Sequence, residues 1–468
     1  MKNMGGQSKF LIGAKRVFNI FNFLKPAPHI PEIEDQAAVQ KKYKYWRFRV
    51  FYSMFMGYVL YYFTRKSFTF AMPSLIKDLG FDKSQLGILA SVLAMTYGFS
   101  KFANGIIGDR SNPRYFMPFG LIMTGIFNIC FGLSSSLMFF ILFWGLNGWF
   151  QGCGWPGCAR LLTHWYSQTE RGRWWSFWNA SHNIGGAMIP LITAAVAQYY
   201  GWRCAMFLPG VVCIFGGFFL MNRLCDTPQS LGLPPIEKFR NDYPTKKHTD
   251  QEHELTVKEI LFTYVLTNPF IWILAASYFF IYVIREAIGA WTVLYLIEAK
   301  GYSQIGAGGT VMWFDIGGMF GAITAGWVSD TAFKGRRAPI CIIFSACIAG
   351  ALSLFWFYSG TIYIVDAILL FNLGFFTFGP QMLIGMAPAE LSHKKAAATA
   401  TGFVGWIAYL GAASAGYPLG TITQQFGWEA FFLALTICAI VPSILLLPLW
   451  GVRSAEDSIF RKKEAAAA

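Results

Sequence analysis

The chain has 468 residues, of which 55% are hydrophobic and only 13% are charged. A soluble globular protein carries about 25% charged residues, so this composition excludes the soluble classes and indicates a polytopic membrane protein. The formal net charge is +14, but the basic residues form short clusters between apolar runs, which is typical of loops facing anionic lipid rather than of a nucleic-acid-binding surface.

The N-terminal segment, residues 1–48, is predicted to be a basic cytoplasmic segment without a cleavable signal peptide. Its stretch Ser8–Lys25 mixes apolar and basic side chains. This mixture fits either a helix lying on an anionic membrane surface or an ordinary basic tail.

The transmembrane helices are predicted from charge-free runs. Tyr115 to Ala159 contains no Asp, Glu, Lys or Arg; these roughly 45 residues are too many for one span and fit two. The same criterion predicts about twelve spans along the chain. They are predicted to start near residues 49, 84, 115, 137, 174, 203, 269, 304, 338, 361, 397 and 430.

The polar segments divide the chain into two bundles. Residues 49–223 are predicted to form an N-terminal six-helix bundle and residues 269–452 a C-terminal one. Between them, the proline-containing residues 224–268 read as a cytoplasmic linker, and residues 453–468 as a basic cytoplasmic tail. Lys and Arg are concentrated in alternate loops, which predicts that both termini are cytoplasmic.

A repeated loop motif relates the two bundles. Gly105-x-x-Gly108-Asp109-Arg110 is echoed by Gly326-x-x-x-Asp330, and the two aspartates are 221 residues apart. The predicted fold is therefore an all-α membrane protein of two pseudo-symmetric six-helix bundles, an architecture typical of transporters with a site at the repeat interface. The motif fits either a gating clasp made by Asp109, Arg110 and Asp330 or an ordinary polar turn.

Two arginines fall inside predicted spans at nearly the same offset, because Arg65 and Arg285 are 220 residues apart. Planar guanidinium groups suit a phosphate group, so this pair predicts an anion site between the bundles. The alternative is an ion pair between Arg285 and Glu286. Helix neighbours point about 100° apart, so we expect that pair to be poorly placed.

Other polar residues in the spans are candidates for the same site. Tyr58, Tyr62 and Arg65 follow helical spacing and are predicted to share one face. His182 fits either a structural histidine or a ligand contact, and Lys101 either a site residue or a side chain that reaches the membrane surface.

Several motifs resemble those of the organophosphate:phosphate antiporters of the major facilitator superfamily, in particular its bacterial hexose-phosphate branch. The resemblance extends over about residues 40–450. The motifs that carry it are Gly57–Lys66, Tyr97–Phe102, Gly108–Arg114, Phe150–Pro156, Trp178–Gly186, Phe378–Gly385 and Thr401–Gly411.

The resemblance implies a transporter of the bacterial inner membrane that exchanges a hexose phosphate, with glucose-6-phosphate favoured, for inorganic phosphate by alternating access. It implies that Arg65 and Arg285 hold the phosphoryl group. The residues implied to line the site are His182, Lys101, Tyr409, Tyr58, Tyr62, Tyr97 and Asn179. No cofactor or metal is expected.

The seventh helix departs from the family pattern, because Ala290 stands before Trp291 where the family often has an acidic residue. The intramembrane Lys66 is therefore expected to pair with Asp315, with Glu286 as the reserve partner. These three are the predicted intramembrane gating and salt-bridge residues.

Other functions remain compatible with the sequence. The first is a membrane receptor that binds glucose-6-phosphate and signals to a partner such as a sensor kinase. The second is a cation-coupled symporter, since Asp315 and Glu286 could bind a proton. A membrane enzyme is disfavoured, because the spans contain no nucleophile–base pairing and no metal-ligand cluster.

Overall fold

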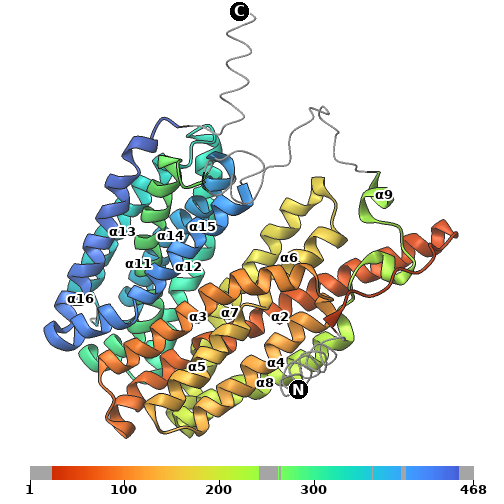
Figure 1. Cartoon of the computed structure of the whole chain (residues 1–468). Coiled ribbons are helices and arrows are strands. Elements are labelled where there is room, and N and C mark those ends of the chain that lie inside the picture. Colours follow the sequence, from red (N-terminus) through yellow and green to blue (C-terminus); the bar gives the residue numbers. More distant parts are fainter. Residues whose placement is uncertain (1–23, 242–261, 263–264, 361, 392–396, 453–468) are drawn as a thin grey trace, which may run out of the picture.

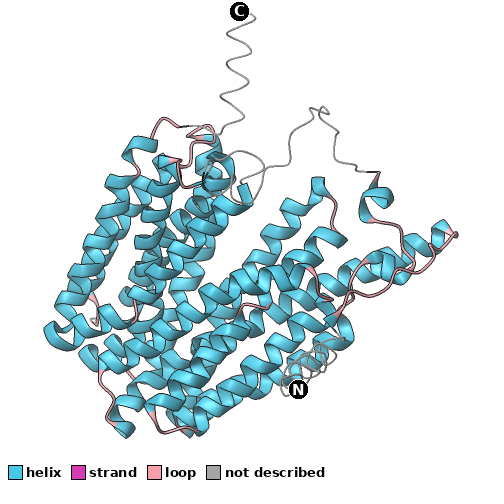
Figure 2. Cartoon of the chain, in the orientation of Figure 1, coloured by secondary structure: helices cyan, strands magenta, loops and turns pink. Residues whose placement is uncertain are grey.

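The computed structural model describes residues 24–241, 262, 265–360, 362–391 and 397–452. Within these ranges the chain forms helices and short connections without a strand (Figure 2). Nine helices of the described part are long and apolar enough to cross a membrane. The predictions for the first 23 residues, for the central linker (242–261) and for the tail (453–468) lie outside the described residues.

The N-terminal half consists of helices that run alternately up and down, except that α6 continues in the direction of α5 (Figure 1). They are α2 (Gln36–Leu79), α3 (Lys83–Asp109), α4 (Pro113–Leu133), α5 (Leu137–Gln151), α6 (Gly154–Trp165), α7 (Gln168–Tyr200) and α8 (Trp202–Arg223). The first helix begins well before the predicted residue 49, because the carboxylate of Asp35 caps it by accepting a hydrogen bond from the Ala37 amide. The predicted fourth span is interrupted between α5 and α6 at Gly152.

The start of the linker packs against the N-terminal half. It contains the short elements η2 (Pro228–Leu231) and α9 (Ile236–Arg240). Lys42 donates a hydrogen bond to the Leu231 carbonyl at 2.8 Å. Asp226 accepts one from the Ala27 amide at 2.8 Å and forms an ion pair with Arg160 at 3.2 Å. The first part of the linker therefore packs as an ordered extension of the N-terminal half.

The helices of the C-terminal half also alternate in direction, except that the first segment of α16 continues the direction of α15 along α3 (Figure 1). Its elements are α11 (Pro269–Lys300), α12 (Gln304–Thr331), α13 (Ala338–Tyr358), α14 (Tyr363–Leu391), α15 (Ala397–Ser414), α16 (Tyr417–Leu445) and η5 (Leu447–Leu449). Gly427 has φ of 78° and breaks α16 into two segments. The second segment begins close to the predicted start at residue 430, although the total of about twelve spans stays a prediction.

The two ends of the helices define two faces of the molecule. The linker face carries loops 110–112, 224–241 and 332–337, and the opposite face carries loops 80–82, 134–136 and 301–303. The halves meet through α2 with α11, α3 with α15 and α16, and α7 with α12. Toward the linker face, the ribbons of the two halves diverge (Figure 1).

Polar contacts join the two halves near the opposite face. Lys83 at the start of α3 forms an ion pair with Glu298 of α11 at 2.8 Å. On the other side of the interface, the side chain of Gln198 accepts a hydrogen bond from the Ile305 amide at 3.1 Å. These contacts hold the two halves together at the opposite face.

The repeated loop motif lies on the linker face. Asp330 forms an ion pair with Arg337 at 2.5 Å, and Arg337 also pairs with Glu390 at 2.9 Å. The hydrogen bonds to Glu390 are the largest cause of a raised pKa of Arg337. All three residues belong to the C-terminal half. In the N-terminal copy Arg110 is exposed, and the Asp109 side chain lies outside the described part of the structure.

Candidate functional site

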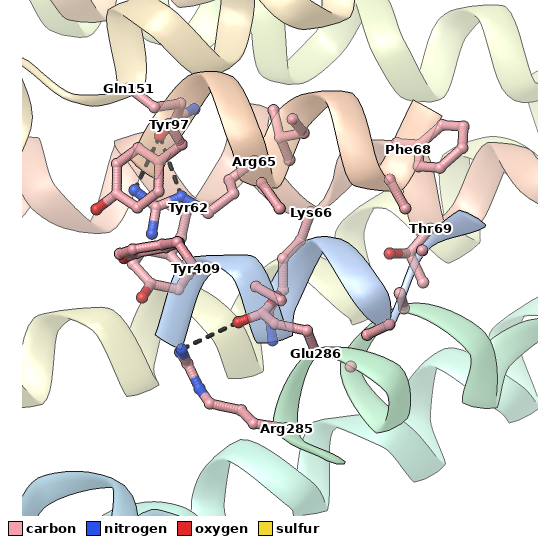
Figure 3. A pocket seen from close by; sticks show the side chains of 18 of the residues that line it. Tyr62, Arg65, Lys66, Phe68, Thr69, Tyr97, Gln151, Arg285, Glu286 and Tyr409 are labelled. Carbon is pink, nitrogen blue, oxygen red and sulfur yellow. Dashed lines mark hydrogen bonds and ion pairs between the residues drawn. The ribbon is translucent and has the colours of Figure 1, made fainter. Parts of the chain in front are cut away.

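A cavity lies between the two halves. Its empty volume is about 950 Å³, including open solvent, and residues of α2, α3, α5, α11, α12, α14, α15 and the connection between α15 and α16 contribute to its wall. Figure 3 shows Arg65 and Arg285, from α2 and α11, on this wall. The two arginines predicted from the sequence therefore line one cavity, although their role stays a prediction.

Arg65 is contacted by uncharged side chains. Its guanidinium lies between the rings of Tyr62 and Tyr97, 4.6 and 4.4 Å from their centroids. Its Nε and Nη2 atoms both donate to Oε1 of Gln151, at 3.2 and 3.1 Å (Figure 3). The amide of Gln151 in turn donates to the Tyr61 carbonyl and to Thr64. The side chain is fixed in position, and its charge has no carboxylate partner among the described residues.

Arg285 has a charged partner, contrary to the sequence prediction. Its Nη1 atom lies 3.0 Å from Oε1 of Glu286 (Figure 3). The backbone directions of neighbouring residues do diverge in a helix, but both side chains are long enough to bend together within the cavity. The Arg285 guanidinium also lies 5.2 Å from the ring centroid of Phe378.

Aromatic rings surround the two arginines. The ring centroids of Tyr97 and Tyr409 are 5.0 Å apart, and those of Tyr409 and Tyr282 are 5.5 Å apart. This chain of rings connects α3 of one half with α15 and α11 of the other. Tyr62, Tyr97 and Tyr409 all line the cavity, as the sequence suggested.

The remaining predicted site residues lie farther from the cavity wall. Tyr58 is buried against Trp178 at a ring distance of 4.8 Å. His182 is half-buried, with its ring 5.9 Å from that of Tyr62. Lys101 places its Nζ atom 5.5 Å from the Tyr409 ring. Asn179 is half-buried on α7, one turn before His182.

The structure also brings forward residues that the sequence did not single out. Gln151 orients Arg65, Phe378 packs beside Arg285, and Thr69 and Trp144 line the cavity. Gln151 and Phe378 lie within motifs that carry the family resemblance. Their contacts cross between helices, and spacing within one helix cannot reveal such contacts.

Lys66 and Asp315 form the predicted contact between the halves. Lys66 Nζ lies 2.8 Å from Asp315 Oδ2, and Asp315 is only 1% exposed. Gly289 and Ala290 line the cavity at the level of Lys66 and carry no charge. A buried carboxylate needs a close cation, so this pair is an electrostatic link between α2 and α12.

Neutralising both members of this pair is expected to reveal strong coupling. In a double-mutant cycle with Lys66→Met and Asp315→Asn, we expect a coupling energy in unfolding of about 0.5–3 kcal/mol. The reason is that each single change leaves a buried charge without its partner. The measurement is thermal unfolding of the four purified proteins, and strictly additive effects would contradict an energetic link.

Gly186 of α7 leaves room for the Asp315 carboxylate of α12. A Cβ atom at Gly186 would lie 2.7 Å from the Asp315 carboxyl carbon. Gly186→Ala is therefore expected to destabilise the protein by about 1–3 kcal/mol, because the crowded atoms must shift. Thermal unfolding tests this, with Gly350→Ala as the control, since a Cβ atom there meets open space. Equal Tm values for the two variants would refute the expected crowding.

Comparison with known proteins identifies the family. The model of the Major Facilitator Superfamily matches residues 54–416. A protein named "Probable hexose phosphate transport protein" from Chlamydia trachomatis is 58% identical, over 93% of this chain and 97% of its own length. The "Membrane sensor protein UhpC" of Escherichia coli is 47% identical, over 93% of this chain and 99% of its own.

More distant relatives share the architecture. The "Glycerol-3-phosphate transporter" of Bacillus subtilis is 41% identical, over 94% of this chain and 100% of its own length. Among solved structures, an inward-facing bacterial homologue of the human lysosomal transporter Spinster matches with a TM-score of 0.66 at 15% identity. That match covers 86% of this chain and 95% of the other, and it shows the fold alone.

The relatives in these comparisons are named as transport or sensor proteins rather than as enzymes. The chain is an integral membrane protein of the major facilitator superfamily and belongs to its organophosphate:phosphate antiporter branch.

Proposed function

We propose that this chain exchanges a hexose phosphate, with glucose-6-phosphate as the favoured substrate, for inorganic phosphate by alternating access. The observation that carries the proposal is that Arg65 and Arg285, one from each half, line a single cavity. A phosphoryl group between them would accept hydrogen bonds from both halves at once. The names of the most similar relatives support a hexose phosphate as the organic substrate.

The surroundings of the two arginines suit phosphate recognition. Gln151 fixes the plane of the Arg65 guanidinium by accepting hydrogen bonds from its Nε and Nη2 atoms, so its Nη1 atom takes no part in that contact. Tyr62, Tyr97 and Tyr409 narrow the space beside Arg65 and offer hydroxyl groups. In this proposal the residues that line the cavity are supported by four residues packed behind them, namely His182, Lys101, Tyr58 and Asn179.

Alternating access would use the contacts between the halves. Lys83 with Glu298 and Lys66 with Asp315 join the halves near the opposite face and at the level of the cavity. The halves diverge toward the linker face (Figure 1). We propose that this face is cytoplasmic in a bacterial inner membrane, with both chain termini on the same side, and that Arg110 and Asp330 act in gating there.

Transport can be tested by counterflow. Proteoliposomes loaded with unlabelled glucose-6-phosphate are expected to take up labelled inorganic phosphate, and external glucose-6-phosphate should compete with this uptake. Free glucose should not compete, because it lacks the group that pairs with the arginines. Absence of uptake by protein that still binds phosphate would contradict the exchange reaction.

A receptor function is the second candidate, since the chain is 47% identical to a protein named as a membrane sensor. The same arginines would then bind external glucose-6-phosphate. The conformational change caused by binding would be transmitted to a partner such as a sensor kinase. The two functions differ in flux rather than in binding. Binding of glucose-6-phosphate without counterflow would favour the receptor.

A further inference from the structure

Glu286 is an acidic side chain inside the cavity, next to the arginine of the C-terminal half. Its side chain is 43% exposed and lines the same cavity as Arg65 and Arg285. Its carboxylate contacts Arg285 at 3.0 Å, whereas Arg65 contacts the neutral amide of Gln151. The two arginines are therefore not equivalent, although they occupy corresponding places in the two halves.

The charges of the cavity show what this asymmetry means. Lys66 is already paired with Asp315, and Arg285 with Glu286. Arg65 and Lys101 have no carboxylate partner within the described part of the chain. Arg65 and Lys101 thus contribute two uncompensated positive charges, which match the charge of a phosphate dianion, while the Nη1 atom of Arg285 is already engaged with Glu286.

We propose that Glu286 is a built-in competitor of the phosphoryl group, holding Arg285 in the unloaded site and releasing it when phosphate arrives. The inference rests on the proposed function, because it assumes that Arg285 binds phosphate. Phosphate meets Arg65 first, since that guanidinium is orientated and has no anionic partner. It then takes Arg285 from Glu286, because a dianion that bridges two arginines binds each more strongly than one carboxylate does.

The competition also aids release. When a phosphate leaves, the Glu286 carboxylate re-forms its contact with Arg285 and replaces the lost negative charge, so that the largely buried Arg285 guanidinium is never left without an anionic partner. Compared with a site that lacks this carboxylate, Glu286 therefore weakens the binding of phosphate but speeds its exchange. Glu286 is suited to this role by its exposure in the cavity wall, whereas Asp315 lies outside that wall and is buried against Lys66.

The test is the variant Glu286→Gln, which keeps the size of the side chain but removes its charge. Equilibrium binding of labelled inorganic phosphate to the full-length protein in lipid nanodiscs is expected to become about tenfold tighter. Exchange in proteoliposomes at saturating phosphate is expected to slow, so that affinity and maximal rate change in opposite directions. Unchanged affinity in Glu286→Gln would overturn the proposal.

A second variant separates direct contact from a general effect of charge. Glu286→Asp keeps the charge but shortens the reach toward Arg285, so direct competition predicts an affinity for phosphate above that of the wild type and close to that of Glu286→Gln. Wild-type affinity in Glu286→Asp combined with tight binding in Glu286→Gln would show a field effect only, and would overturn the contact. Glu429→Gln, an exposed site on α16 outside the cavity wall, is the matched control.

The experiment also tells this inference apart from the proposed function. If the wild-type protein and all variants fail to bind phosphate, the phosphate site itself is wrong, and the role of Glu286 falls with it. If the wild type binds phosphate and exchanges it but the Glu286 variants behave like it, only the competitor role is refuted.

Discussion

Replacing Arg65 or Arg285 by lysine is expected to weaken the binding of inorganic phosphate by about tenfold or more. Lysine keeps the positive charge but loses the planar fork that donates two parallel hydrogen bonds to a phosphoryl group. If charge alone decided binding, both substitutions would be nearly silent. Equilibrium binding of labelled phosphate to the purified proteins measures the effect.

The two lysine variants should differ from one another. Arg65 donates twice to Gln151 and lies between two tyrosine rings, and a single ammonium group cannot reproduce this arrangement. A lysine at 285 could still pair with Glu286, as the native arginine does. We therefore expect the larger loss of affinity for Arg65→Lys.

Suitable controls separate binding from folding. Arg173→Lys makes the same chemical change at an exposed position outside the cavity wall and should leave the affinity for phosphate unchanged. Thermal unfolding of each variant shows whether the protein remains folded. Wild-type affinity in both cavity variants, with intact folding, would rule out the assignment of Arg65 and Arg285.

Much of the site could be predicted because helices impose a period and the two halves repeat. Helical spacing places Tyr62 and Arg65 on one face, and their contact is present in the structure. The common offset of Arg65 and Arg285 predicted that both would meet between the halves, and both line the cavity. The contact of Lys66 with Asp315 followed from the cost of an unpaired charge in a membrane.

The details that escaped prediction depend on side-chain reach and on contacts between helices. The expected separation of Arg285 and Glu286 was derived from backbone directions, but long side chains can meet despite diverging Cβ bonds. The contact of Gln151 with Arg65 joins α5 to α2, and no spacing within either helix indicates it. The early start of α2 depends on a cap at Asp35 in a polar stretch, where hydrophobicity gives no signal.

The charge of the empty site predicts obligatory exchange rather than uniport. Because Glu286 already neutralises Arg285, the uncompensated charges are those of Arg65 and Lys101. Repulsion between Arg65 on the cavity wall and Lys101 behind it opposes closure of the halves around a site without phosphate, because closure removes the water that screens the two charges. A phosphate dianion cancels these charges and contacts both halves, so closure becomes favourable only when the site is loaded.

Efflux from preloaded vesicles tests this expectation. Labelled glucose-6-phosphate should leave proteoliposomes rapidly when the external buffer contains inorganic phosphate. It should leave slowly when the external buffer is a chloride salt solution without phosphate or sulfate. Equal, fast efflux into both buffers would mean that the empty carrier reorientates freely and that the repulsion of Arg65 and Lys101 does not control closure. Absence of efflux in both buffers, from protein that binds glucose-6-phosphate, would instead favour the receptor.

In Lys101→Met the loss of one uncompensated charge should raise the slow efflux without phosphate toward the rate with phosphate, since less repulsion then opposes closure of the empty site.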